Sequence, residues 1–448
     1  MRYIFVLFLG ICCGNLQSKI SVQSSTLANG LKVVVLKNPL LPCVTVYTKY
    51  DVGTADDPAE VVGLSHMLEH MMFKGSRKYP IGSIDNVLNS CGGHSNAHTT
   101  FDTTVYTFSL PAEYLDTALD IEADRMENLD IDEKAFLSEQ KVVLEERRMR
   151  LGNHAFKTAA EILRRSMFTA HPYGIFPIGY EAHIKAYTTE ALTAHYKKWY
   201  APNNATIIVI GPYNLDYVLP KIEEKFASIA ARDIPERKRI AEPDREGLTT
   251  TIEQENARSE NIYITISYRA PTLIKKPEAF FVMGLLQATL CGNQNGSLYQ
   301  KMVKEKSLAL SVSCRYAYGE DDMDFSFSLM LDPVMNVEKA EQFLFEQLGS
   351  FLKNGLLKKD FENAKLGKKN ALDFALDGES FLIAVADRLV EGLPFEAVTD
   401  YEKLLDAVTL DQAHKMLKFI LAKPPVVIAR YYPKGKMPKR SYHNALVE

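Results

Sequence analysis

The order of strands and helices in this chain begins again about halfway along it, and this repetition limits the folds open to it. The segment TFSL at residues 107–110, followed by Pro111 and a helical pattern, recurs as SFSL at residues 326–329, ahead of Pro333 and a second helical pattern. The offset of 219 residues is about half of the 448-residue chain. Because a similar order of elements surrounds both copies, the sequence predicts two related α+β halves.

The segment between the halves reads as a linker. Residues 232–247 contain Pro235 and Pro243, many charged side chains and no apolar period, which is typical of a connection rather than of a packed element. We therefore expect a first domain over residues 19–235, a linker over residues 236–247 and a second domain over residues 248–448.

Apolar periodicity locates the elements inside each half. Alternating or continuous apolar runs predict strands, and apolar residues spaced by three and four predict helices. The expected strands are residues 31–36, 44–52, 94–99, 103–110, 205–210, 249–255, 261–268 and 310–318. The expected helices are residues 62–73, 81–89, 111–129, 134–151 and 278–290.

The composition excludes several classes of protein. With 46% hydrophobic and 24% charged residues, the chain has the profile of a globular protein with material for more than one core. The net charge is only −4, which argues against a nucleic-acid partner bound by phosphate neutralisation. No apolar run reaches the roughly 20 residues of a membrane span, so we expect none.

The N-terminus resembles a secretory signal peptide. Arg2 precedes an apolar run at residues 3–13, and small or polar residues follow as far as Ser18. A buried first strand is the alternative interpretation, but the flanks of the run are wrong for one. We expect residues 1–18 to direct export, to the periplasm if the source is a Gram-negative bacterium.

Four cysteines lie beyond this segment, namely Cys43, Cys91, Cys291 and Cys314. They have no zinc-site spacing. In an oxidising compartment they can pair, and isolated buried thiols are the other interpretation. The sequence leaves both open.

The strongest chemical signal is the pentapeptide HMLEH at residues 66–70, in an apolar helical context. On a helix His66 and His70 stand one turn apart on one face, where two imidazoles can share one Zn²⁺ at about 2.0–2.1 Å each. Glu69 lies on the adjoining edge, within reach of a metal-bound water. The alternative is two core or surface histidines beside an exposed glutamate. The order H-x-x-E-H is the inverzincin signature.

A catalytic zinc site needs a third protein ligand. The helix expected at residues 134–151 offers Glu139, Glu145 and Glu146. Glu139 and Glu146 are two turns apart on nearly the same face, whereas Glu145 is rotated by about 100° from Glu146. One carboxylate can bind metal while another supports a histidine. By spacing alone, a solvated charged face explains these glutamates equally well.

The chain resembles the pitrilysin-type (inverzincin, M16) metallopeptidases, the family of insulin-degrading enzyme and the mitochondrial processing peptidase. It looks most like the shorter branch, which comprises bacterial and processing-peptidase members. The matching segments run in order through the first half: LANGL at 27–31, GLSHMLEHMMFKG at 63–75, GGHSNAHT at 92–99, residues 139–146, HPYG at 171–174 and YAPNNA at 200–205.

The resemblance implies a fold and a set of site residues. The fold would be α+β, with two homologous halves that each form a mostly antiparallel sheet flanked by helices. One zinc ion per chain would be bound by His66, His70 and Glu146, with Glu69 as general base and Glu139 as a supporting acid. Asn96, Ala97 and Thr99, in the segment NAHT, would belong to the edge strand that accepts substrate backbone. The activity implied is zinc-dependent hydrolysis of peptides or unfolded protein segments.

The second half departs from the family at positions that matter for the reaction. The 219-residue offset places His66, Glu69 and His70 on Leu285, Ala288 and Thr289, so we expect no second metal site. Members of the family often supply an arginine and a tyrosine from this half. Here Leu310 stands at the tyrosine position, and Val303 or, with a slip of one residue, Lys304 at the arginine position.

These departures lead to an expectation about partners. Long family members close four homologous domains around a peptide, and this chain has only two. We therefore expect a hetero-oligomer with an M16-like chain that supplies the arginine and tyrosine, with a homodimer as the alternative. The rival functional interpretation is a catalytically weak or silent subunit of a peptidase-like or structural complex.

Overall fold

The computed structural model describes residues 21–152, 155–237, 239–244, 247–256, 259–272, 276–317, 319–376, 379–390, 392–394, 397 and 400–438. The predicted signal peptide, residues 1–18, lies outside these ranges. The chain divides into two compact units, each built from three segments. Unit 1 comprises the described residues within Met1–Arg148, Ala170–Glu242 and Asn370–Tyr401, and unit 2 those within Met149–Thr169, Pro243–Lys369 and Glu402–Glu448. Each unit therefore takes one segment from the other half of the sequence.

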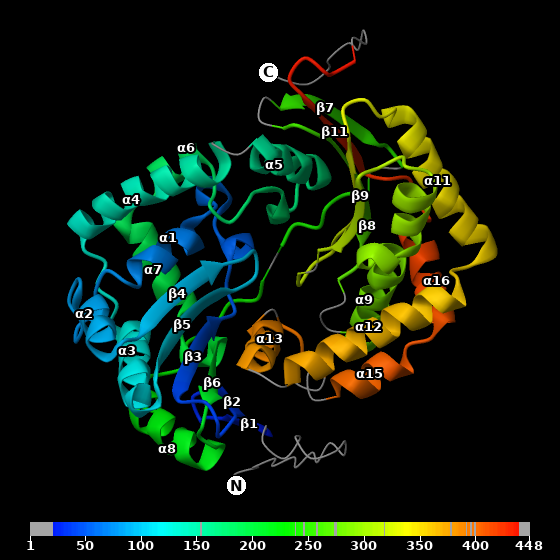
Figure 1. The fold of residues 1–448 in the computed structure, drawn as a ribbon. Helices are drawn as coiled ribbons and strands as arrows, with labels where there is room; N and C mark the ends of the chain where they lie inside the picture. Colours follow the sequence, from blue (N-terminus) through cyan, green and yellow to red (C-terminus); the bar gives the residue numbers. More distant parts are fainter. Residues whose placement is uncertain are drawn as a thin grey trace. The chain divides into compact units, whose positions relative to one another are not determined.

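Unit 1 is a sheet with helices on both faces (Figure 1). Its strands are β1 (Ser21–Thr26), β2 (Lys32–Lys37), β3 (Cys43–Tyr50), β4 (His94–Thr99), β5 (Thr104–Pro111) and β6 (Ala205–Gly211). Its helices are α1 (Leu64–Met71), α2 (Ser83–Cys91), α3 (Leu115–Asn128), α4 (Glu133–Arg147), α6 (Glu181–Ala186), α7 (Thr189–Trp199), α8 (Leu215–Phe226) and α13 (Glu379–Val390). The strand order is β1-β2-β6-β3-β5-β4, so β4 forms one edge.

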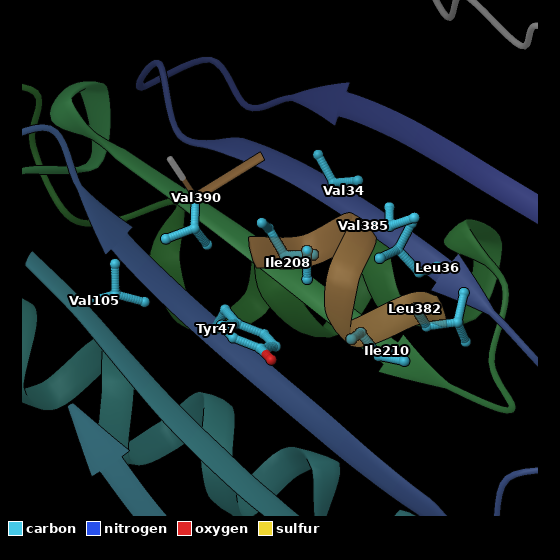
Figure 2. Packing of buried hydrophobic residues seen from close by; sticks show 10 residues of the cluster. Val34, Leu36, Tyr47, Val105, Ile208, Ile210, Leu382, Val385 and Val390 are labelled. Atoms are coloured by element: carbon cyan, nitrogen blue, oxygen red, sulfur yellow. The ribbon is translucent and has the colours of Figure 1, made fainter. Parts of the chain in front are cut away.

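Burial of this sheet on both faces explains why β6, with the sequence ATIIVIG, is apolar at consecutive positions. Val33, Val35 and Val46 face the side covered by α3 and α8, while alternate residues face the other way. That second face is covered by α13, which comes from far along the sequence. Figure 2 shows Leu382, Val385 and Val390 of α13 directed toward the sheet residues Val34, Leu36, Tyr47, Ile208 and Ile210.

Unit 2 repeats the architecture with a smaller sheet. Its strands are β7 (Thr250–Asn256), β8 (Ile262–Ala270), β9 (Ser311–Tyr316), β10 (Met323–Leu331) and β11 (Val427–Pro433). Its helices are α5 (Ala155–Met167), α9 (Pro277–Cys291), α10 (Ser297–Tyr299), α11 (Val337–Asn354), α15 (Tyr401–Ala407), α16 (Leu410–Ile420) and the part of α12 (Lys358–Leu376) up to Lys369. The helix α5, from the first half of the sequence, packs against β7 and β11, and the carbonyl of Ala159 accepts a hydrogen bond from Tyr431 Oη.

The two sheets share one topology, which confirms the predicted α+β fold of two related halves. The order β7-β11-β8-β10-β9 matches β2-β6-β3-β5-β4, and the first pair in each series is parallel while the others are antiparallel. The repeat extends to side chains. Thr45 and Ser109 hydrogen-bond across β3 and β5 at 3.0 Å, and Thr265 and Ser328 do so across β8 and β10 at 3.3 Å. The repeated tetrapeptides thus occupy β5 and β10, the same place in each sheet.

The first part of the charged segment between the halves is bound to unit 1. Arg239 pairs with Asp102 at 2.5 Å and with Asp56 at 3.1 Å. Glu242 accepts hydrogen bonds from the backbone N–H groups of Ala170 and His171, both at 2.8 Å. In the sequence, the charged residues of this segment predicted a linker. In the structure, the same charged side chains bind the segment to unit 1.

Cys291 and Cys314 form a disulfide that joins the end of α9 to the edge strand β9. The sequence left the pairing of the four cysteines open, and the structure decides it for these two. The bond closes a loop with a sequence separation of 23 residues. By the chain-entropy model, a loop of this length stabilises the folded state by about 3 kcal/mol, because it restricts the unfolded chain.

We predict that the double change Cys291→Ser and Cys314→Ser lowers the free energy of unfolding of unit 2 by about 3 kcal/mol. Urea unfolding followed by circular dichroism measures this as a lower midpoint. Cys91→Ser is the control, since Cys91 is outside the disulfide. A reducing agent should lower the midpoint of the wild type but not that of the double variant, and equal midpoints for both proteins would contradict the prediction.

Candidate metal centre

The pentapeptide HMLEH lies on the short helix α1, which is buried on almost every side. Met67, Leu68 and Met71 are fully buried and supply the apolar contacts of the helix. His66 and Glu69 are buried too, with 4% and 8% of their surface exposed. A short helix with so many polar groups needs partners for them in the interior.

Helix α4 supplies such partners through a stripe at helical spacing. Phe136, Glu139 and Val143 are its buried residues, and Glu146 lies one turn further on along the same face. Glu146 Oε2 is 3.2 Å from His70 Nε2 and 3.6 Å from His66 Nε2. The ligand atoms of His66, His70 and Glu146 all lie within 4.8 Å of one another. Glu145 points elsewhere and pairs with Arg148 at 2.8 Å, its side chain 61% exposed.

Glu139 orients His70 from the other side of its ring. His70 Nδ1 is 2.9 Å from Glu139 Oε1, and Lys74 Nζ is 2.7 Å from Glu139 Oε2. An Nδ1–H bonded to a carboxylate leaves Nε2 directed at the space shared with His66 and Glu146. Lys74 belongs to the family-like segment at residues 63–75, but the sequence alone gives it no role. Its contact with Glu139, 65 positions later, appears only in the folded chain.

The electrostatics of His70 reflect these two carboxylates. Burial alone would lower the pKa of His70, but hydrogen bonds to Glu139 and Glu146 outweigh it and raise the pKa to about 9. The pKa of Glu139 is lowered: burial would raise it, and the bonds from His70 and Lys74 prevail. The neutral imidazole is the form that binds metal, so metal binding at Nε2 releases the proton held there.

Glu69 faces the edge strand β4. Thr99 Oγ1 donates a hydrogen bond to Glu69 Oε2 at 2.5 Å. Ala97 is paired with Tyr106, and Thr99 with Thr104, so both lie on the face of the sheet that carries α1. Asn96, paired with Thr107, lies on the opposite face. The three residues that the sequence grouped as a substrate strand are therefore divided between the two faces.

The donor set fits zinc. Two imidazole nitrogens and a carboxylate oxygen are common zinc ligands, and bond lengths near 2.0–2.1 Å place tetrahedral ligands about 3.3 Å apart. The observed separations of 3.2 and 3.6 Å from Glu146 match that value. Within the described ranges, His66, His70 and Glu146 are the only group of this kind.

The corresponding helix of unit 2 is α9, whose sequence PEAFFVMGLLQATLC is mostly apolar. Leu285, at the position of His66, is fully buried, and the hydroxyl of Thr289 bonds to the Leu285 carbonyl at 2.7 Å. Leu310, at the tyrosine position, is 40% exposed next to β9. Lys304, the slipped arginine position, is exposed in a π-helical turn (Gln300–Glu305).

Comparisons with known proteins agree with the fold. Residues 32–175 match the family model described as Insulinase (Peptidase family M16), and residues 186–368 match the model described as Peptidase M16 inactive domain. The chain belongs to the M16 peptidase family. It is 27% identical to the zinc protease PqqE of Helicobacter pylori over 85% of this chain and 86% of that protein.

Two solved structures share the fold. The crystal structure of a protease from Helicobacter pylori superimposes with a TM-score of 0.82 at 25% identity, covering 92% of this chain and 100% of that one. The periplasmic protease PqqL from Escherichia coli gives a TM-score of 0.76 at 20% identity, covering 92% of this chain and 47% of that one. No helix in the described part of the chain has the length and apolar character required to cross a membrane.

We predict that Glu146→Gln weakens zinc binding more than Glu145→Gln, because only Glu146 faces the two histidines. The loss should exceed the roughly 10–100-fold expected from removing a supporting hydrogen-bond partner. Competition with a chelating indicator measures the zinc dissociation constant, and Glu145→Gln is the matched control from the next position of α4. Equal affinity of the two variants, or the reverse order, would show that Glu146 is not a ligand.

Proposed function

We propose that the chain is a zinc-dependent endopeptidase that hydrolyses peptides or unfolded segments of proteins. The observation that carries the proposal is the convergence of His66 Nε2, His70 Nε2 and Glu146 Oε2. Membership of the M16 family and the similarity to PqqE, a protein named a zinc protease, support it.

In this proposal His66, His70 and Glu146 hold one zinc ion per chain, and Glu139 orients His70. A zinc ion with three protein ligands acts as a Lewis acid and makes water a nucleophile at neutral pH. Glu69 accepts the proton of the attacking water and later delivers it to the nitrogen of the leaving amine. The hydrogen bond from Thr99 fixes the orientation of the Glu69 carboxylate.

The edge strand β4 is the proposed substrate strand. Among the described strands it pairs with β5 alone, so its other edge is the one proposed to accept an extended peptide. A peptide added there binds through main-chain hydrogen bonds, so recognition does not need one particular side chain. Asn96, Ala97 and Thr99 supply this backbone, and Thr99 links it to Glu69.

We expect Glu69→Gln to retain zinc and to lose peptide hydrolysis by roughly 10²–10⁴-fold, because an amide cannot take the proton of water. A fluorogenic peptide library gives the rates with and without chelator, and elemental analysis gives the zinc content. Glu145→Gln should hydrolyse at the wild-type rate. Near wild-type hydrolysis by Glu69→Gln would remove Glu69 from the role of base. A wild-type chain that binds zinc and hydrolyses nothing would favour the silent-subunit interpretation.

A second chain completes the proposed enzyme. The chain has Leu310 and Val303 or Lys304 where the family often has tyrosine and arginine. Each missing donor to a developing oxyanion typically costs on the order of 10²–10³ in rate. The proposed partner is a related M16-type chain without HxxEH that carries the arginine and the tyrosine.

The partner proposal predicts that the purified chain alone hydrolyses peptides slowly and that a chain of this type raises the rate at least 10²-fold. Rates are measured for the single chain, for the mixture, and for a mixture in which the partner's tyrosine is changed to phenylalanine. Full activity of the lone chain, unchanged by any partner, would leave a self-sufficient homodimer as the better proposal.

We also propose that the chain works outside the reducing cytoplasm, in the periplasm if the source is Gram-negative. The disulfide between Cys291 and Cys314 supports this, because disulfides form and persist mainly in oxidising compartments. The signal-like residues 1–18 are the sequence feature that agrees with it.

A further inference from the structure

The metal-binding helix α1 begins without a capping side chain of its own. Its N-cap residue is Gly63, at φ +101°, and a glycine has no side chain to accept a hydrogen bond from the first turn. The unsatisfied N–H groups at this end need an acceptor because Leu64 and Ser65 are both buried.

Asp57, six residues before Gly63, supplies that acceptor. Its Oδ2 accepts a hydrogen bond from the Gly63 N–H at 2.7 Å, and its Oδ1 accepts one from the Ser65 N–H at 3.1 Å. The Asp57 side chain has no exposed surface. A carboxylate at this place also complements the positive end of the helix dipole. Asp57 thus caps a helix to which it does not belong.

The neighbours of Asp57 fix the carboxylate in turn. Ser65 Oγ donates to Asp57 Oδ1 at 2.6 Å and lies 2.9 Å from His195 Nε2. Burial lowers the pKa of His195 to about 3, so its ring is neutral and Nε2–H can donate to Ser65 Oγ. Burial raises the pKa of Asp57 to about 8, against the hydrogen bonds from Ser65 and Gly63. The groups that hydrogen-bond to Asp57, namely the N–H of Gly63, the N–H of Ser65 and the Ser65 hydroxyl, all donate. They therefore favour the ionised carboxylate, which only accepts, over the protonated acid.

The turn that carries Asp57 is also bonded to the end of the edge strand. The N–H groups of Thr54 and Ala55 donate to the carbonyls of Thr100 and Phe101, at 3.1 and 2.8 Å. A Cβ on Gly53 would lie 2.4 Å from the Phe101 backbone, so the two segments are in close contact. One turn therefore contacts α1, which carries His66, Glu69 and His70, and the residues that follow Thr99.

We propose that Asp57 is a positioning residue for the metal centre, which fixes the start of α1 so that His66 and His70 meet Glu146. This inference rests on the proposed zinc site. It extends the site to Asp57, which lies nine positions before His66. In the described hydrogen bonds Asp57 bonds to Gly63 and Ser65 and to none of the three proposed ligands.

The test is the zinc affinity of Asp57→Asn, with zinc alone as the probe and a chelating indicator as competitor. An amide has one acceptor oxygen, so its NH₂ must face the N–H of Gly63 or of Ser65. We expect the zinc dissociation constant to rise roughly 10–100-fold, as for loss of a supporting contact. The visible spectrum of the cobalt-substituted protein should change as well, because it reports the ligand geometry.

The matched control is Asn214→Ala, which removes the side-chain cap of another helix of unit 1. Asn214 Oδ1 accepts from the Tyr217 N–H at the start of α8, which carries none of the proposed ligands. This variant should lose stability while its zinc affinity and cobalt spectrum stay at wild-type values. An equal loss of affinity in both variants would overturn the proposal, since the effect would then follow stability alone.

Ser65→Ala covers the case in which Asp57→Asn does not fold. It removes the hydroxyl that holds Asp57 and keeps the carboxylate with both N–H bonds, and we expect a loss of zinc affinity of roughly 5–10-fold, equivalent to one hydrogen bond. Wild-type affinity and spectrum in every folded variant would overturn the proposal while leaving the zinc site intact. Absence of zinc binding by the wild type would instead overturn the proposed function.

Discussion

The candidate metal centre depends on a fixed separation between α1 and α4, because neither helix carries all of the converging side chains. Close backbone contact sets this separation. A Cβ on Gly179 would lie 2.2 Å from the Val62 carbonyl oxygen, and a Cβ on Gly63 would lie 2.4 Å from Tyr187 Oη. Arg147, the residue after Glu146, donates to the Gly179 carbonyl at 2.5 Å, and Tyr187 Oη donates to the Val62 carbonyl at 3.0 Å. The end of α4 and the start of α1 are thus both held at the place where Gly63 and Gly179 pack closely together.

The sheet of unit 1 gives this arrangement a rigid base. Its central strands are buried on both faces, with α3 and α8 on one face and α13 on the other. Arg125 is fully buried beside Glu122, and its guanidinium lies 4.3 Å from the centre of the Tyr106 ring. Tyr106 is the partner of Ala97 in the edge strand, so the buried ion pair supports the strand proposed to bind substrate.

Local features of the sequence were sufficient for part of this structure. The predicted strand at residues 94–99 has the bounds of β4, and the predicted strand at 205–210 falls short of β6 by one residue. The i, i+4 spacing placed His66 and His70 on one face of α1, and the seven-residue spacing placed Glu139 and Glu146 on one face of α4. Both predictions were possible because the geometry of a helix depends only on residues near one another in the sequence. The choice of Glu146 over Glu145 came from family resemblance, and the structure turns Glu146 toward the histidines.

Long-range contacts could not be predicted in the same way. The apolar run at residues 205–210 predicted a strand, but no periodicity identifies α13, about 170 residues later, as its cover. The contacts of Lys74 with Glu139, and of Thr99 with Glu69, join residues 65 and 30 positions apart. Asp57 was missed for another reason: an aspartate before a helix is a common cap, but the usual position is the N-cap itself, which Gly63 occupies here.

The two sheets show how one topology can serve different purposes at its edge. In unit 1 the edge strand β4 faces α1, and its Thr99 reaches Glu69. In unit 2 the equivalent edge strand β9 is joined to α9 by the disulfide and by a hydrogen bond of 2.8 Å from Gln287 to the Cys314 carbonyl. The hydrogen-bonded order of the strands is the same, because it depends on the backbone. The candidate metal ligands differ because the positions of His66, Glu69 and His70 in α1 are held by Leu285, Ala288 and Thr289 in α9. A repeat of the fold therefore does not require a repeat of the side chains that form the candidate metal site.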